Sequence, residues 1–568
     1  MGKFTKEIRN ENKNATVWVL ILSIIVLLPN ILLASYGNDI TQVSFLSVIA
    51  YLIISVFLFL LPSLFLKMRI FFLCYGIFVL LAPFEIVHIY LNRMPITTAF
   101  LLSIFDTDWN ESTEILASLK IPIVVIVFFW LFYFYITLKK IKNVHLIRSF
   151  KVRMFFLCAF FFAILLGYSY FYYSEYNMSS DKKGVFKSVN RSFLMKSYKI
   201  YPYGLVINSY RVYATKREIK KGWAKIKKFQ FNAQKEKPID EREIYVFVIG
   251  ETSRYHNFSI NGYQRETSPM LSKTMNLISY SDLFSEANIT SSSLPIILTR
   301  ASAKEYNLAF VEKSFVDAFK EAGFKTYWIA NQSANNSFVR RISKDTDEEF
   351  FMTIDFDADN NFDEKLWDFL SEILKREEQK VLIVLHTLGS HFRYNFRYPL
   401  SYEIFKPSFK GSFDYNMISS KNKDMFINTY DNSILYTDFF LATTIQKLDS
   451  LKAVSAMIFV SDHGENLFDT PENVVLHGGS KFTEYDLHVP FFVWTSDEYN
   501  QQYPEKADNL LRNKDKRLTT DCIFYSFLDI ADITFPEQIL SKSISSEYLK
   551  QDSVRYIIDT NMEVQEGF

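Results

Sequence analysis

Acidic and imidazole side chains stand directly after three apolar runs in the second half of this chain. Glu251 follows the run EIYVFVIG, His386 and His391 follow KVLIVL, and Asp462 and His463 follow VSAMIFV. Apolar runs of this length that end in polar residues are typical of buried strands. Because the loops beyond the carboxyl ends of parallel strands lie at one edge of a sheet, we expect these side chains to meet there.

Carboxylates and imidazoles gathered at one edge point to a metal ion, because zinc and manganese accept both kinds of ligand. The run SDHGE is the strongest signal, since Gly464 lets the backbone turn while its neighbours converge on an ion. An isolated histidine, in contrast, is more often a core or surface residue. Cys74, Cys158 and Cys522 are too dispersed for a disulfide framework or a thiolate site. Any metal is therefore expected on oxygen and nitrogen.

The elements that must position these residues follow from the same pattern. Helix-like segments such as 314–322 and 363–375 separate the apolar runs. This alternation predicts a mostly parallel sheet with helices on both faces for residues 241–568.

The N-terminal part, residues 1–175, has a different composition. It contains five apolar stretches that are long enough to cross a hydrocarbon core about 30 Å thick. They are 17–33, 43–66, 70–90, 121–138 and 154–173. The segments before the first stretch, after the second and after the fourth hold twelve Lys or Arg, whereas the other two connections hold only Arg93 and Lys120. This asymmetry predicts a cytoplasmic N-terminus, an uncleaved first span and an exported C-terminal domain. Glu85 and His88, near the outer end of the third stretch, are expected at the membrane interface.

Residues 176–240 are basic and aromatic by turns, as in TKREIKKGWAKIKKFQF. This composition predicts a linker that lies on anionic lipid, or alternatively a solvated helical linker. The formal net charge of +1 gives no case for a nucleic-acid partner. We expect a monomer whose partners are lipids and an envelope acceptor.

Four runs carry a resemblance to a known family: GETSRYHNFSINGY, NTYDN, SDHGE and LHG. Together they resemble the phosphoethanolamine transferases that modify lipid A or the lipopolysaccharide core, within the alkaline phosphatase and sulfatase superfamily. The resemblance covers essentially the whole chain. It implies a multi-pass protein of the bacterial inner membrane with a five-helix transmembrane domain and an α/β, sulfatase-like catalytic domain in the periplasm.

The resemblance also implies site residues. The family's nucleophile is the threonine of a Thr-x-x-Ser-x-Pro run, which TSSSLP supplies at Thr290; without that pattern, any of its four hydroxyls is equally a helix cap. One zinc ion, with manganese as the alternative, is expected on Glu251, Thr290, Asp462 and His463. Further ligands of a second metal ion or of the lipid headgroup are His391 and His477. Catalytic roles are expected for Thr290, His386, His391, His477 and Glu465. Headgroup contacts are expected from Thr107 and Glu111.

The implied reaction passes through a covalent intermediate. Thr290 attacks the phosphorus of phosphatidylethanolamine, expels diacylglycerol and passes phosphoethanolamine to a second substrate. The acceptor stays open among a lipid A phosphate, a lipopolysaccharide core sugar and another envelope glycan. Lipid A-modifying relatives often have a cysteine pair that brackets the nucleophile loop, whereas Glu286 and Ile296 occupy that neighbourhood here and no pairing is possible. Asn336 aligns with a substrate-binding lysine of some relatives.

Three rival functions remain. The first is a sulfatase-like hydrolase, although the segment SLPII lacks the arginine of the sulfatase signature. The second is a glycerol-phosphate transferase of the lipoteichoic acid synthase type. The third is a membrane-tethered binding module whose acidic and histidine residues are structural.

Overall fold

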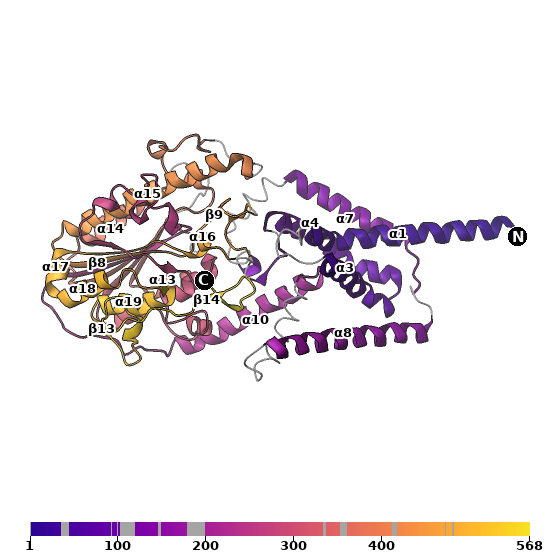
Figure 1. The fold of residues 1–568 in the computed structure, drawn as a ribbon, viewed down its shortest axis with the longest axis horizontal. Helices are drawn as coiled ribbons and strands as arrows, with labels where there is room; N and C mark the ends of the chain where they lie inside the picture. The colour runs from indigo at the N-terminus through magenta and orange to yellow at the C-terminus, as the bar shows by residue number, and fades with distance from the viewer. Residues whose placement is uncertain are drawn as a thin grey trace. The chain divides into compact units, whose positions relative to one another are not determined.

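The computed structural model of the chain forms two compact units (Figure 1). Unit 1 comprises Met1–Leu101 and Thr113–Arg211, and unit 2 comprises Leu102–Ser112 and Val212–Phe568. The described residues are 2–35, 45–92, 94–98, 100–102, 120–145, 149–178, 199–332, 337–352, 361–411, 417–471, 473–479 and 482–567. Thr107, Glu111 and Asn336 lie outside them.

Unit 1 contains a helix at the position of each predicted apolar stretch. These helices are α1 (Gly2–Ser35), α3 (Phe45–Leu60), α4 (Met68–Asn92), α7 (Lys120–Lys140) and α8 (Phe150–Met178). Among the described residues, Val17–Ser35 and Met68–Tyr90 are long and apolar enough to cross a membrane, and Tyr51–Leu64 is apolar but shorter. Two of the five predicted spans therefore meet this criterion.

Close packing joins α4 to α7 at Gly76. A Cβ atom there would lie 2.4 Å from the ring of Phe134, so a larger residue would force this ring to shift. Trp130 Nε1 donates to Gly76 O at 2.7 Å, and Tyr133 OH donates to Phe72 O at 2.8 Å. These bonds satisfy polar atoms within an otherwise apolar contact.

Glu85 and His88 are buried within unit 1, with 2% and 7% of their surfaces exposed, so both side chains pack against protein, and their position at the membrane interface stays a prediction. The segment after α4 provides the cover. Ile96 N donates to a carboxylate oxygen of Glu85 at 3.2 Å, and the Phe100 ring lies 4.3 Å from the His88 ring. Hydrophobic length along one helix carries no information about such a contact.

Helix α10 (Tyr203–Ile226) forms the second part of the predicted linker and continues from unit 1 into unit 2. Lys220, Lys221 and Lys225 are exposed on it. Gly222, in contrast, is buried, and a Cβ there would lie 1.9 Å from Phe310 O. The lysines therefore point to solvent, while the role of this helix on lipid stays a prediction.

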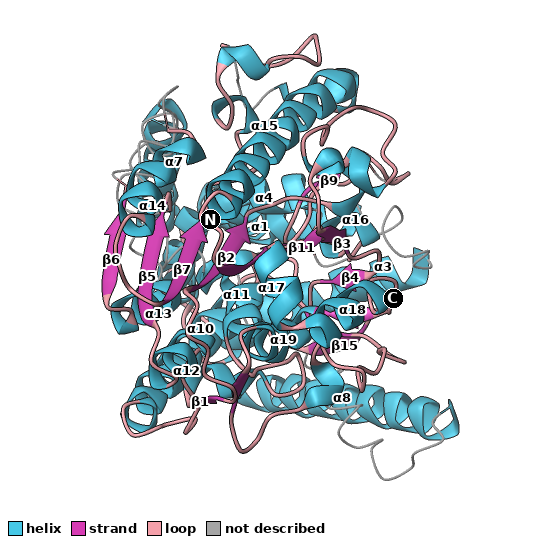
Figure 2. Ribbon diagram, turned by 90° about the vertical axis from the view of Figure 1, so that its left-hand side faces the viewer, coloured by secondary structure: helices cyan, strands magenta, loops and turns pink. Residues whose placement is uncertain are grey.

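Unit 2 is built on a seven-stranded sheet in the order β3-β11-β8-β2-β7-β5-β6 (Figure 2). The strands are β2 (Glu243–Gly250), β3 (Leu277–Ser279), β5 (Lys325–Ala330), β6 (Glu348–Phe351), β7 (Lys380–His386), β8 (Val454–Ser461) and β11 (Phe491–Thr495). The five strands from β8 to β6 are parallel, and β11 and β3 pair antiparallel. The mostly parallel sheet is confirmed, with an antiparallel edge added.

Helices cover both faces of this sheet, as predicted (Figure 1). They are α11 (Thr290–Leu298), α12 (Phe315–Glu321), α13 (Ser337–Asp345), α14 (Leu366–Leu374), α15 (Lys423–Asp449), α16 (Glu484–Leu487), α17 (Asp497–Gln502), α18 (Pro504–Arg512) and α19 (Ile523–Ile530). Along β2, Phe247 packs on the face of α12 and α19, whereas Val246 and Val248 pack on the face of α14 and α15. This alternation follows from the period of two in a strand.

Short strand pairs complete unit 2. They are β1 (Gln234–Lys235) with β13 (Ile533–Thr534), β4 (Leu283–Phe284) with β12 (Leu518–Thr519), β9 (Asn466–Leu467) with β10 (Val475–Leu476), and β14 (Tyr556–Ile558) with β15 (Val564–Glu566).

Candidate active site

The three strands predicted to deliver the site are neighbours in the sheet. In the parallel register, Ile249 of β2 lies opposite His386 of β7, and Gly250 lies opposite Ser461 of β8. The chain therefore leaves all three strands at the same edge, and Glu251 and Asp462 follow directly. This arrangement is the one that the apolar runs predict.

Glu251, Asp462 and His463 form a buried cluster at this edge. Their ligand atoms all lie within 4.8 Å of one another. Asp462 Oδ1 accepts from Thr252 N at 3.0 Å and from His463 N at 2.8 Å. Asp462 Oδ2 is buried and has no hydrogen-bond partner among the described residues. The backbone thus orients the carboxylate so that one oxygen remains available to a cation.

The cluster fits a zinc ion. His463 Nδ1 donates to Gly464 O at 2.9 Å, so its Nε2 is the nitrogen that faces Asp462 Oδ2, at 3.3 Å. Burial and the neighbouring Asp462 charge raise the pKa of Glu251 well above its ordinary value. A divalent cation would compensate both carboxylates, and two carboxylates with one imidazole are ligands that zinc accepts.

Thr290 is the first residue of α11, and its hydroxyl faces this cluster. The Oγ1 atom lies 3.2 Å from His463 Nε2 and 3.5 Å from Glu251 Oε1. Ser292 Oγ instead contacts Met562 Sδ at 3.8 Å, and Ser293 Oγ donates to Thr290 O at 3.4 Å. Thr290 is half-buried at a helix N-terminus, where backbone N–H groups favour an anion.

His477 approaches the cluster from the segment after β10. Its ring centroid lies 4.0 Å from that of His463, and its Nδ1 lies 3.2 Å from Glu465 Oε1. Tyr394 OH donates to the other oxygen of Glu465 at 2.7 Å. Burial alone would lower the pKa of His477, but the Glu465 carboxylate raises it above its ordinary value. His477 is therefore suited to hold and release a proton.

The two histidines after β7 differ from His477. Burial lowers the pKa of His391 to about 3, and its Nδ1 donates to Phe392 O at 2.7 Å. The neutral ring therefore presents Nε2 as an acceptor. His386 packs edge-on against Trp328, and burial lowers its pKa to about 4. Both of its ring nitrogens lack a hydrogen-bond partner among the described residues, and it is not part of the metal-ligand cluster.

Asp363 supports the site and was missed by the motifs. Its carboxylate accepts from Leu388 N at 2.8 Å and Gly389 N at 2.9 Å, which fixes the loop after β7. Gly389 has φ +50°, and a Cβ there would lie 2.8 Å from Glu251 O. In sequence, Asp363 had only the signature of a helix start, because its partners lie far along the chain.

The loop that carries Thr290 is closed without cysteines. Glu286 Oε2 accepts from Ala303 N at 2.7 Å, and Ile296 packs with Ala303 and Ile558. Burial raises the pKa of Glu286, and the Asp521 charge raises it further. A buried hydrogen bond and apolar contacts therefore hold this loop in place without a disulfide.

Comparison with known proteins places the chain in a family. The sulfatase family profile matches residues 243–533, slightly more than half of the chain. The chain belongs to the sulfatase family. Phosphoethanolamine transferase EptC of Escherichia coli K12 is 27% identical to this sulfatase-family chain over 327 residues, 55% of each protein. EptA of Salmonella typhimurium is 31% identical over 271 residues, 46% of this chain and 48% of that protein. The chain matches about half the length of these relatives.

Solved structures share the fold. The C-terminal periplasmic domain of EptC from Escherichia coli has 26% identity and a TM-score of 0.53, covering 59% of this sulfatase-family chain and 95% of that one. The same domain is known in complex with Zn. The integral membrane protein EptA from Neisseria meningitidis has 20% identity and a TM-score of 0.73, covering 93% of this chain and 98% of that one. The likeness to EptA from Neisseria meningitidis extends the shared fold to both units.

Proposed function

We propose that this chain is a zinc-dependent phosphoethanolamine transferase of the bacterial inner membrane. The donor is phosphatidylethanolamine, and the acceptor is a lipid A phosphate, a lipopolysaccharide core sugar or another envelope glycan. The observation that carries the proposal is the Thr290 hydroxyl, 3.2 Å from His463 Nε2 beside two buried carboxylates. This arrangement suits nucleophilic attack at phosphorus. The names of the curated relatives support phosphoethanolamine as the transferred group.

The residues divide the reaction into two halves. Zinc held by the three clustered residues supplies the positive charge that favours an ionised hydroxyl. Thr290 Oγ1 then forms a bond to phosphorus as the bond to the diacylglycerol oxygen breaks. His477 suits protonation of that oxygen, because Glu465 outweighs burial and raises its pKa. In the second half the acceptor oxygen attacks the same phosphorus, its proton returns to His477, and Thr290 is released. His391 suits a headgroup contact or a second zinc ion.

The membrane part of the proposal has five spanning helices and a cytoplasmic N-terminus. It is supported by the helices α1, α3, α4, α7 and α8 of unit 1 and by exposed apolar side chains on α7, where Val124 and Phe128 are 68% and 66% exposed. Thr107 and Glu111 are the proposed headgroup contacts. In single-cysteine variants, Lys67→Cys and Lys142→Cys are expected to resist a membrane-impermeant thiol reagent added from the periplasmic side. Labelling of either cysteine would contradict this topology.

Donor choice tests the activity. Full-length protein in lipid nanodiscs is given phosphatidylethanolamine, phosphatidylglycerol or an aryl sulfate, and diacylglycerol or sulfate release is followed. We expect release from phosphatidylethanolamine alone, none after EDTA treatment and none from Thr290→Ala. The matched control is Ser291→Ala on the same turn, which is expected to keep the rate. Turnover of phosphatidylglycerol instead would establish a glycerol-phosphate transferase, and turnover of the aryl sulfate would establish a sulfatase. No turnover of any donor would favour a binding module.

A further inference from the structure

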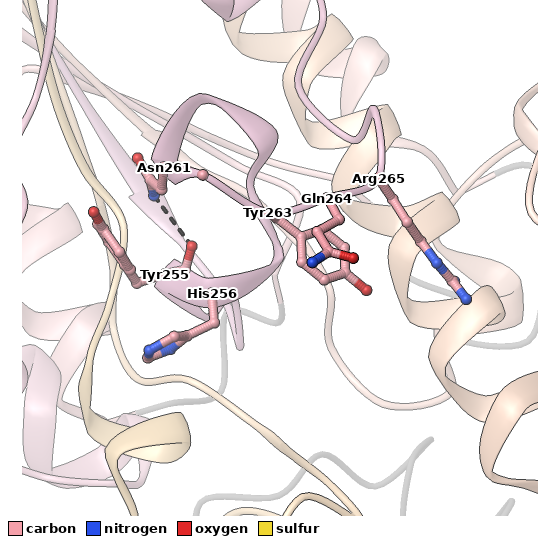
Figure 3. Close-up of a pocket in the computed structure, with 7 residues that line it drawn as sticks. Tyr255, His256, Asn261, Tyr263, Gln264 and Arg265 are labelled. Carbon is pink, nitrogen blue, oxygen red and sulfur yellow. Dashed lines mark hydrogen bonds between the residues drawn. The ribbon is translucent and has the colours of Figure 1, made fainter.

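A separate hollow lies in unit 2, on the segment that continues from the end of β2. It has a volume of about 390 Å³ and is lined by Tyr255, His256 and residues 261–265 (Figure 3). The sequence of this segment belongs to the long family-like run, yet none of these side chains takes part in the reaction described above. Tyr255 follows Glu251 by four positions, so the hollow lies on the same strand-end segment as the metal cluster.

A fixed turn forms this hollow. Asn261 Nδ2 donates to Tyr255 O at 3.1 Å, the bond drawn in Figure 3, and Ser279 Oγ donates to Asn261 Oδ1 at 2.6 Å. Gly262 has φ +97°, and a Cβ there would meet no atom within 4 Å. The glycine allows the left-handed turn and leaves open space above the backbone. The hollow is therefore preformed.

The lining carries no uncompensated charge. The Arg265 guanidinium lies 2.8 Å from the buried carboxylate of Asp431, which also accepts from Tyr263 OH at 3.0 Å. Burial and the nearby Arg254 charge lower the pKa of His256, so its ring is neutral at physiological pH. No carboxylate belongs to the lining residues. Because the one cation of the lining, Arg265, is already paired with Asp431, this hollow favours an uncharged ligand over a phosphate.

Neutral hydrogen-bonding groups and aromatic rings remain to contact a ligand. His256 lines the hollow with its neutral ring, although its Nδ1 is itself buried and has no partner among the described residues. Gln264 is exposed and offers both a donor and an acceptor, and its amide lies between His256 and Arg265 in the view of Figure 3. The Tyr255 ring is held by stacking on His488, with centroids 4.0 Å apart. Such a surface suits an uncharged ring with several hydroxyls.

We propose that this hollow binds an uncharged sugar unit of the acceptor glycan. The proposal rests on the proposed function and narrows it, because it makes a saccharide, rather than a phosphate group, the part of the acceptor that the enzyme recognises.

Separating the two half-reactions tests this site. With full-length protein in nanodiscs, diacylglycerol release without acceptor reports the donor half, and transfer to dephosphorylated core oligosaccharide reports the acceptor half. We expect Gln264→Ala and His256→Ala to leave the first unchanged and to raise the KM for the oligosaccharide at least tenfold. The control is Glu266→Ala, an exposed neighbour outside the hollow, for which we expect the wild-type KM.

Calorimetric titration with the same oligosaccharide provides a readout that needs no turnover. A Kd at least tenfold weaker in Gln264→Ala than in Glu266→Ala supports the site even if the wild type releases no diacylglycerol, a result that would refute the proposed function alone. An unchanged KM and Kd in both hollow variants, or a KM change seen only with phosphorylated lipid A, would overturn the inference.

Discussion

Replacing Asp462 by asparagine separates the metal-binding role of this side chain from its structural role. Oδ1 accepts from Thr252 N and His463 N at 3.0 and 2.8 Å, whereas Oδ2 has no partner among the described residues. Asparagine keeps the first oxygen as an amide carbonyl but places an NH₂ group at the second position. The variant therefore retains the backbone bonds and loses one ligand and one negative charge.

The lost charge has opposite effects on the metal-free and metal-bound protein. The ligand oxygens of Glu251 and Asp462 lie within 4.8 Å, where two unit charges repel by about 3.5 kcal/mol at an effective dielectric constant of about 20. The raised pKa of Glu251 already relieves part of this repulsion. We expect the metal-free Asp462→Asn variant to be about 1–3 kcal/mol more stable than metal-free wild type. Its zinc affinity should fall by roughly a hundredfold or more.

Thermal unfolding of the full chain, after EDTA and after zinc addition, measures both effects. Zinc should raise the Tm of the wild type but hardly that of Asp462→Asn. Without metal, the Tm of Asp462→Asn should be higher than that of the wild type. Asp438→Asn is the control, because Asp438 is also buried and accepts from Met270 N and Leu271 N but does not belong to the metal-ligand cluster. It should lower the Tm and keep the zinc response. A metal-free Asp462→Asn less stable than wild type, or one with a full zinc response, would refute the reasoning.

Three further predictions follow from the same geometry. Gly389→Ala should lower the free energy of unfolding by about 1–3 kcal/mol, because Gly389 has a positive φ and a Cβ there would crowd Glu251 O. Gly411→Ala should cost less, since Gly411 also has a positive φ but has open space around it. Urea unfolding measures both variants, and equal losses would be inconsistent with crowding at Gly389. Glu286→Ala should cost about 1–3 kcal/mol by leaving Ala303 N unpaired, and an unchanged urea midpoint would rule out this bond as a brace. Because the pKa of Glu251 is raised in the folded protein, Glu251 contributes to metal-free stability below about pH 4.3, and this contribution is lost as the pH rises through the folded pKa. Thermal scans from pH 5 to 8 should therefore show a zinc-induced Tm shift that grows with pH. A shift that stays constant would contradict this linkage.

The edge that carries the metal cluster was predictable because its signals are local. Each of the strands β2, β7 and β8 is an apolar run, buried almost throughout, and a chemically distinctive residue follows at once. Burial on both faces requires a continuous apolar run in a parallel sheet. The positions of Glu251 and Asp462 after such runs were therefore predictable from the sequence without any knowledge of contacts.

The rest of the site depends on contacts between distant segments. Asp363 braces a loop 25 residues later, and Tyr394 reaches Glu465 across 71 positions. The antiparallel pairing of β11 was not predicted, because an apolar run reads alike in either direction. Thr252 has φ +56°, an uncommon value for a β-branched residue, and is held by Asp462 and by Tyr430 OH. No local pattern encodes any of these features.

The covalent state of Thr290 tests the central claim most directly. Full-length protein is mixed with headgroup-labelled phosphatidylethanolamine, quenched rapidly in acid and digested for peptide mass spectrometry. The proposed mechanism predicts labelled phosphoethanolamine on Thr290, in an amount equal to the diacylglycerol released, and its loss when acceptor is added before the quench. Diacylglycerol release with no label on the chain, or label on another residue, would contradict it.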